Sequence, residues 1–250
     1  MTLRDSIIDF INSKTKQANE LDYYRQPLVG FSSAADPLYV NIKETVGPHH
    51  LYPQDVLAEV RTLVSFFIPF SQKVIEANRQ DKSVPAREWV DSYDHANNLI
   101  DAISRELVTE LEAGGVKAGT VNSTNNYDEI NLRAPWSHRS AAFVAGLGRF
   151  GLNRMLITPA GAAGRYGTVF LGAELTPTQR SDEELCLFFK NGTCRYCLKR
   201  CPAKAIGQGP DGFARHECNK KLLDITPYSL SLKWELDVCG KCDVGPCAIF

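Results

Sequence analysis

Cysteine is absent from the first 185 residues of this 250-residue chain, and all eight cysteines lie in the last 65, from Cys186 onward. The sequence also lacks an apolar run of about eighteen residues, the length that a membrane-spanning helix needs. Its start, Met-Thr-Leu-Arg-Asp, lacks the apolar stretch of a secretory signal peptide. We therefore expect a cytoplasmic protein with no membrane partner, whose thiols stay reduced rather than forming disulfides.

An excess of charge of one sign is also missing. The 28 lysines and arginines nearly balance the 29 aspartates and glutamates, which leaves a net charge of −1. A balanced charge argues against broad, sequence-independent binding to nucleic acid, because that binding depends on neutralising many phosphates. We therefore do not expect tRNA as a partner.

What the chain does contain is a dense cysteine pattern. The run Cys194-Arg-Tyr-Cys197-Leu-Lys-Arg-Cys201-Pro202 matches the last three cysteines and the proline of the bacterial ferredoxin motif. A second close pair, Cys239 and Cys242, follows about forty residues later. Eight thiolates are twice the four that complete one cubane cluster, so the pattern predicts two [4Fe–4S] clusters. The predicted ligands are Cys186, Cys194, Cys197, Cys201, Cys218, Cys239, Cys242 and Cys247.

Two other uses of eight cysteines remain as alternatives. Two zinc sites with four cysteines each would use the same number of thiolates, and Cys-x2-Cys is also a zinc-binding spacing. A zinc ribbon, however, has no use for the further cysteine three residues on or for the proline after it. Disulfides would need a secreted protein, and nothing in the sequence indicates one.

The spacing also predicts how the cysteines are shared. The ferredoxin motif has a cysteine three residues before its second one, but that position is Asn191 here, so Cys186 is the expected substitute. In ferredoxins the cysteine before the proline ligates the other cluster. On this pattern one cluster takes Cys186, Cys194, Cys197 and Cys247, and the other takes Cys201, Cys218, Cys239 and Cys242.

The rest of the chain predicts an α+β fold. Helices are expected at residues 2–18, 53–60, 85–113 and 136–145. Strands are expected at 63–69, 116–121, 155–158 and 166–171, the first as a buried central strand and the last two as a hairpin. Residues 27–52 are expected to be irregular. Because the elements do not alternate as βαβ units, we predict α+β, with a polar boundary near 177–182 between domains of residues 1–180 and 181–250.

Residues 146–151 spell the dinucleotide fingerprint, with glycines at positions 146, 148 and 151. The fingerprint must follow a strand and open a helix, whereas this stretch is expected to follow a helix and precede a strand. We therefore reject a dinucleotide site. The glycines are expected to permit a sharp turn or the close approach of a bulky cofactor.

With these motifs in place, the sequence resembles epoxyqueuosine reductases and the related reductive dehalogenases. The resemblance rests on residues 145–153, Leu156-Ile-Thr-Pro159, Phe170-Leu-Gly-Ala-Glu-Leu175 and the cysteine pattern that follows. It implies a nitroreductase-like, mixed-sheet domain that binds cobalamin, with FMN as the alternative, joined to a ferredoxin-like domain with two clusters. The implied cofactor-binding residues are Gly146, Gly148, Gly151 and Asn153.

The same resemblance implies a reaction. A low-potential donor such as ferredoxin or flavodoxin would pass electrons through the clusters to the cofactor, which would reduce a small substrate. The sequence departs from the family where its acidic proton donor stands, because that position is Leu132 here. Asp128, Tyr127 and His138 are therefore the candidate proton donors, in that order for the first two.

Two further departures concern the end of the chain. It stops three residues after Cys247, so the helical-repeat extension of longer family members is missing, and its last cysteines lack the Cys-x3-Cys-Pro ending. We expect a short relative whose substrate is not a tRNA base. A non-catalytic electron-transfer protein that docks a redox partner remains the alternative to a reductase.

Overall fold

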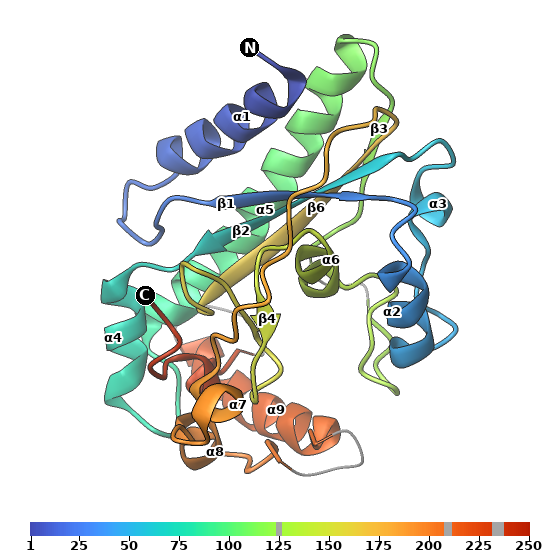
Figure 1. Cartoon of the computed structure of the whole chain (residues 1–250). Helices are drawn as coiled ribbons and strands as arrows, with labels where there is room; N and C mark the ends of the chain where they lie inside the picture. The colour runs from blue at the N-terminus through green and yellow to red at the C-terminus, as the bar shows by residue number, and fades with distance from the viewer. Residues whose placement is uncertain (124–126, 208–211, 232–237) are drawn as a thin grey trace.

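The computed structural model of the chain describes residues 1–123, 127–207, 212–231 and 238–250. Its centre is a four-stranded sheet in the order β1-β2-β6-β3, in which every neighbouring pair of strands is antiparallel (Figure 1). The strands are β1 (Leu28–Ser33), β2 (Thr62–Pro69), β6 (Gly164–Leu171) and β3 (Ala118–Thr120). The α+β class is confirmed. The prediction of a mixed sheet is wrong for the described strands, because all neighbouring strands run antiparallel to each other.

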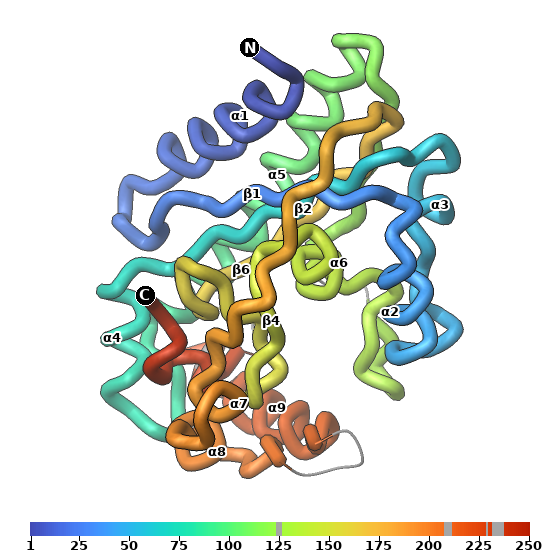
Figure 2. Tube along the Cα trace, in the orientation of Figure 1, coloured from blue at the N-terminus to red at the C-terminus, as the bar shows by residue number. Residues whose placement is uncertain are grey.

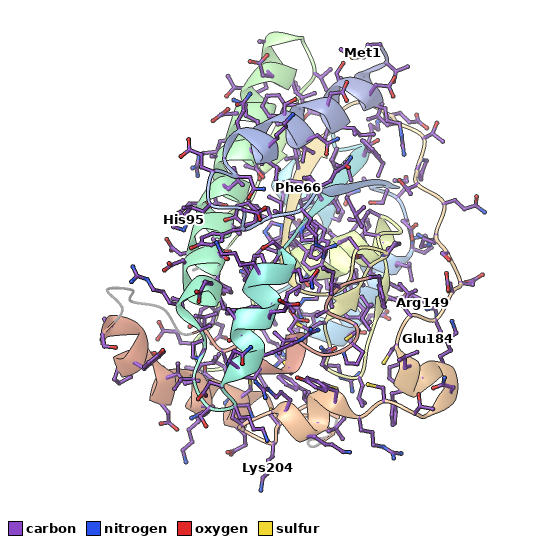
Figure 3. All side chains as sticks on the ribbon, turned by 90° about the vertical axis from the view of Figure 1, so that its left-hand side faces the viewer. Met1, Phe66, His95, Arg149, Glu184 and Lys204 are labelled. Carbon is purple, nitrogen blue, oxygen red and sulfur yellow. The ribbon has the colours of Figure 1, made fainter. Side chains whose placement is uncertain are left out.

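Strand β2 is the buried central strand that its continuous apolar run predicts. All of its residues are buried, and β1 and β6 pair along its two edges. Successive side chains of a strand point to opposite faces, so Phe66 packs with Ile100 in one core cluster while Phe67 stacks on Tyr166 in another. In Figure 3, Phe66 lies inside the molecule and Lys204 projects from its lower end.

Helices cover the two faces of the sheet. Helices α1 (Leu3–Gln17) and α5 (Arg87–Ala113) lie on one face, and the short helix α6 (His138–Val144) lies on the other. Helix α1 begins with a capping box, in which the side chains of Thr2 and Asp5 each bind the backbone of the other. The apolar residues that recur at helical spacing in α5 form the buried stripe of this helix. Gly114 ends the helix. Helix α4 (Gln72–Gln80) packs beside α5.

Three local predictions are wrong. Residues 27–52, expected to be irregular, contain strand β1, helix α2 (Leu38–Val46) and no long loop among them. The predicted hairpin of 155–158 with 166–171 does not form: β5 (Leu156–Ile157) pairs with β4 (Arg149–Phe150), while β6 pairs with β2 and β3. Helix α3 (Pro53–Val56) is shorter than predicted. The glycine stretch follows α6 and opens no helix, as predicted.

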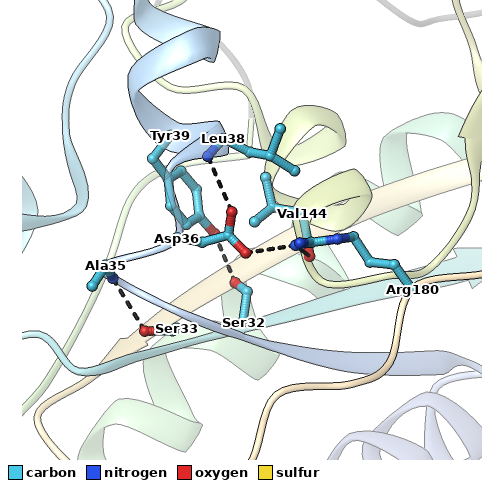
Figure 4. A network of polar contacts seen from close by, with 8 residues as sticks. All are labelled: Ser32, Ser33, Ala35, Asp36, Leu38, Tyr39, Val144 and Arg180. Atoms are coloured by element: carbon cyan, nitrogen blue, oxygen red, sulfur yellow. Dashed lines mark hydrogen bonds and ion pairs between the residues drawn. The ribbon is translucent and has the colours of Figure 1, made fainter.

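A connecting segment, residues 172–185, runs from β6 down the front of the molecule to the cysteine-rich part (Figure 2). Thr178 and Phe31 exchange two hydrogen bonds, so the segment lies along the free edge of β1. Lower down, Arg180 Nη1 lies 2.5 Å from Asp36 Oδ2 and also donates to the carbonyl of Val144 (Figure 4). The connection is thus fixed to the sheet and to α6 rather than hanging free.

The cysteine-rich part contains α7 (Leu187–Asn191), α8 (Tyr196–Arg200), α9 (Arg215–Ser231) and the 3-10 helix η1 (Lys241–Asp243). It is not packed separately from the sheet domain, because Val238, Val244 and Ala248 belong to the same core cluster as Phe66. The two predicted domains therefore share a core. Of the described helices, none combines the length and the apolar character that crossing a membrane requires.

Candidate metal centre

One group of four thiols is assembled from three places in the chain. Cys186 precedes α7, Cys194 and Cys197 surround the start of α8, and Cys247 arrives from the C-terminal end, where its carbonyl accepts from Ala162 N at 2.9 Å. The four line a small cavity of about 30 Å³. Burial raises the pKa of the Cys197 thiol to about 11, and the neighbouring Cys186 and Cys194 raise it further.

The second group lies around α9 and η1. Burial raises the pKa of the Cys218 thiol to about 11, and Cys201 and Cys239 contribute as neighbours. Burial raises the pKa of the Cys242 thiol, and Cys201, Cys218 and Cys239 are among the neighbours that raise it further. Cys201, Cys218, Cys239 and Cys242 are thus neighbours in the fold, and their assignment to one cluster stays a prediction. Cys218, which stands alone in the sequence, joins the second set because α9 carries it there.

Each group offers four cysteine sulfurs, which are the donors that a cubane cluster takes. Among the described residues, no group of three or more His, Cys, Asp or Glu side chains is arranged to hold a single metal ion. Backbone amides also point at the sulfurs: Ala205 N lies 3.4 Å from Cys201 Sγ, and the amide of Lys241 donates to Cys239. Such N–H donors stabilise thiolate charge at cluster sites.

The C-terminal end of α4 anchors the second group. Asn78, fully buried, donates from Nδ2 to the carbonyl of Cys239 at 3.2 Å. The buried Lys241 donates from Nζ to Asn78 O at 2.9 Å and to Asn78 Oδ1 at 2.7 Å. Arg200 Nη2 donates to the carbonyl of Arg79 at 2.5 Å and to that of Asp81. The last carbonyls of a helix lack partners within it, so these cations satisfy them and fix the cysteine loops to α4.

The glycine stretch packs against the protein itself. A Cβ on Gly148 would overlap the backbone of Ile157 in β5, and one on Gly151 would overlap the side chain of the same residue. Gly146, with φ +76°, faces the backbone of the connecting segment at Gln179 and Arg180. A cavity of about 210 Å³ adjoins Gly146 and Gly148 on the side of that segment. The groups that approach these glycines closely are therefore other segments of the same chain.

Asn153 lies with the cysteines rather than with the glycines. Its side chain is 5% exposed, lines the cavity of the first cysteine group and donates from Nδ2 to the carbonyl of Cys242 at 2.9 Å. The four residues predicted to bind one organic cofactor are thus split between an internal turn and the metal centre. Their role in binding an organic cofactor stays a prediction.

Asp128 and Tyr127 lie on the loop that leads to α6. The Asp128 carboxylate accepts from the side chain of Asn131 at 2.6 Å and from the amides of Ile130 and Asn131, which lowers its pKa. It is therefore ionised at neutral pH and holds no proton to donate. The Tyr127 side chain is 44% exposed. The same loop touches the cysteine-rich part where Arg215 Nη1 donates to the carbonyl of Leu132 at 3.4 Å.

His138 is bonded through both ring nitrogens. Nε2 lies 3.1 Å from the carbonyl of Asn122, which can only accept, so Nε2 carries the proton and Nδ1 accepts from the Thr168 hydroxyl at 3.0 Å. Burial lowers the pKa of His138 to about 4. The imidazole is thus neutral and ties the start of the loop to β6. The described hydrogen bonds of the Asp128 carboxylate stay within its own loop, whereas those of His138 go to Asn122 and to β6.

Sequence reasoning missed several residues of this centre: Asn78, Arg79, Trp89, Lys241 and Asp243. Lys241 gave a signal, since it is the single charge between the cysteines of the Cys239–Cys242 pair. Asp243 is buried, and burial raises the pKa of its carboxyl well above the usual range. Its Oδ1 has no hydrogen-bond partner among the described residues. Asn78 and Trp89 carry no local signal, because only folding brings α4 and α5 to the cysteines.

No family model matches the chain, and no curated protein matches it. Solved structures do. An epoxyqueuosine reductase from Bacillus subtilis is 16% identical with a TM-score of 0.55, covering 98% of this chain and 67% of that one. Another, solved with an epoxyqueuosine-modified tRNA stem loop, is 17% identical with a TM-score of 0.56, covering 97% and 66%. A reductive dehalogenase, whose structure suggests a mechanism for B12-dependent dehalogenation, is 19% identical with a TM-score of 0.52, covering 71% and 23%.

The solved structures come from the same proteins that the sequence resembles, and at this identity they show a shared fold. The chain spans about two thirds of the length of the epoxyqueuosine reductases and about a quarter of that of the dehalogenase.

Proposed function

We propose that the protein is an iron–sulfur oxidoreductase that passes electrons through two [4Fe–4S] clusters toward the reduction of a small substrate. The observation that carries this proposal is the gathering of eight cysteines into two adjoining groups of four. Cys242 lines the cavity of the first group although it belongs with the second, so the two groups are neighbours. Neighbouring clusters form a path for electrons, and the fold shared with known reductases supports the assignment.

Cobalamin is the proposed terminal cofactor, with FMN as the alternative, because one structural neighbour is described as acting in B12-dependent dehalogenation. The residues assigned to it from the sequence lie at an internal turn and at the metal centre. What the chain itself offers for chemistry is a proton donor. Asp128 is ionised and His138 is neutral with its Nε2 proton bound to Asn122. We propose the exposed phenol of Tyr127 as the donor to the substrate.

The proposed electron donor is a low-potential protein such as ferredoxin or flavodoxin. The whole proposal is tested by measuring the iron and zinc content of protein that has been purified without oxygen. We expect ~8 iron per chain, as two cubane clusters require, and broad visible absorption that dithionite bleaches. Bound corrinoid would then appear in the same spectrum. Stoichiometric zinc with negligible iron would overturn the proposal.

A second candidate is a non-catalytic electron-transfer protein. It is favoured by one observation, the packing of Gly148 and Gly151 onto β5 where a cofactor was expected. This candidate predicts full iron content, no corrinoid or flavin after reconstitution with either, and rapid reduction and re-oxidation by partner proteins. Retention of corrinoid through gel filtration would exclude it.

A further inference from the structure

Lys241 carries a positive charge into the interior of the metal centre. Its side chain is fully buried, and it stands between Cys239 and Cys242 on the loop of the second cysteine group. Burying an ammonium group is unfavourable unless a partner compensates the lost hydration. Its two hydrogen bonds go to the oxygens of Asn78, at 2.9 and 2.7 Å, and both of these are uncharged.

The charged groups that act on Lys241 define what its charge faces. Cys239 is the first of them, ahead of Arg200, which repels it, and of the exposed carboxylate of Asp81. Cys239 in turn receives a hydrogen bond from the backbone amide of Lys241 and feels the positive charge of its side chain. Lys221 on α9 is a second, weaker cation that acts on Cys239. Asn78, which binds the ammonium group, also donates to the carbonyl of Cys239 at 3.2 Å, so the charge is held beside the loop of the second group.

A purely structural clamp would not need this charge. The two oxygens of Asn78 accept hydrogen bonds, and a neutral amide of similar length could donate to them at a smaller desolvation cost. Arg79 and Arg200 already join α4 to the cysteine-rich part through backbone carbonyls. The retained charge has a physical use only if an anion lies beside it, and a cluster with four thiolate ligands is such an anion.

We propose that Lys241 raises the reduction potential of the cluster held by Cys201, Cys218, Cys239 and Cys242. This inference rests on the proposed function. One-electron reduction adds a negative charge to a cluster, and a buried cation stabilises the reduced form more than the oxidised form in a medium of low dielectric constant. Lys241 thereby makes this cluster easier to reduce than it would be with a neutral residue at position 241.

The test is a redox titration with dithionite, followed by electron paramagnetic resonance on protein of known iron content. In Lys241→Gln we expect one of the two reduction waves to move to lower potential. A tenfold less favourable reduction corresponds to about 59 mV for a one-electron couple, and we expect at least that shift. The other wave stays in place. Cys218→Ala should abolish the wave that moves, and Lys241→Arg, which keeps the charge, should leave it near its wild-type position.

Lys220→Gln is the matched control, because it removes the same charge from an exposed position on α9 and should move neither wave. Wild-type protein without two clusters would refute the proposed function itself. Full iron content with an unmoved wave in Lys241→Gln would refute the role of Lys241 alone. If Lys241→Gln does not retain the cluster, Lys221→Gln decides: it should lower the same wave by a smaller amount, and an unchanged wave there overturns the inference.

Discussion

The indole ring of Trp89 occupies the space where a side chain at position 240 would stand. A Cβ on Gly240 would overlap the ring atoms Cε2, Cζ2 and Nε1, and Gly240 has φ +66°. Trp89 lies in the first turn of α5 and packs edge-on against Phe70, 5.1 Å away between ring centroids. The loop between Cys239 and Cys242 therefore packs closely against the core of the sheet domain.

Gly240→Ala is expected to destabilise the protein and to lose iron from the second cysteine group. The substitution adds backbone strain at a positive φ and a clash with a buried ring, together about 2 kcal/mol or more. Urea unfolding and iron analysis measure the two effects. Gly115→Ala is the control, since Gly115 has φ +79° with no atom near its absent Cβ, and should show the strain alone with full iron. Equal stability of the two variants would contradict the packing argument.

Cys218→Ala is expected to remove one cluster and leave the other. Cys218 has Cys201 and Cys239 as neighbours, so its loss should leave ~4 iron per chain. Cys194→Ala should also leave ~4 iron, but from the other cluster, and the two variants should differ in their paramagnetic resonance spectra. Unchanged iron content in Cys218→Ala would show that the cysteine is only a packed side chain.

His138 is expected to stay neutral through mildly acidic pH. Its pKa is about 4 against an ordinary 6.5, so below 6.5 the unfolded chain takes up a proton that the folded chain does not. The contribution of His138 to stability is therefore full well above pH 6.5 and falls as the pH drops toward 4, by about 1.4 kcal/mol at pH 5.5. NMR titration should find one histidine without a transition above pH 5, absent from His138→Gln. A transition near 6.5 for that residue would refute the buried, neutral assignment.

Gly148→Ala is expected to destabilise the protein with or without any organic cofactor. Its Cβ would overlap the carbonyl group of Ile157, and backbone atoms in a paired strand cannot move aside cheaply, so we expect a loss of about 2 kcal/mol or more. Gly119→Ala, whose nearest neighbour is 3.8 Å from the new Cβ, is the control. A stable Gly148→Ala variant that had lost only corrinoid binding would restore the glycines to a cofactor site.

We expect no tight binding of tRNA at physiological salt, because a net charge of −1 provides little release of counterions. Filter binding across a range of salt concentrations measures it. Sub-micromolar affinity with a steep salt dependence would contradict the expectation and would make a tRNA base the leading substrate.

The sequence alone determined the features that arise from local chemistry. The close spacing of Cys194, Cys197 and Cys201 and of the Cys239–Cys242 pair predicted a metal centre built from cysteines. The continuous apolar run of β2 predicted a buried central strand, and apolar residues at helical spacing predicted the helix that α1 forms. Each of these depends on residues within a few positions of one another.

Only the tertiary structure decided the contacts between distant segments. Strand β1 was not predicted, because its partner residues in β2 lie about thirty to forty positions further along the chain. Strand β6 pairs with β2, about a hundred positions earlier, rather than with its neighbour β5. Lys241 reaches Asn78 across 163 positions. Such contacts form because the whole chain buries apolar surface when it folds. A short stretch of sequence does not show which distant segments will pack together.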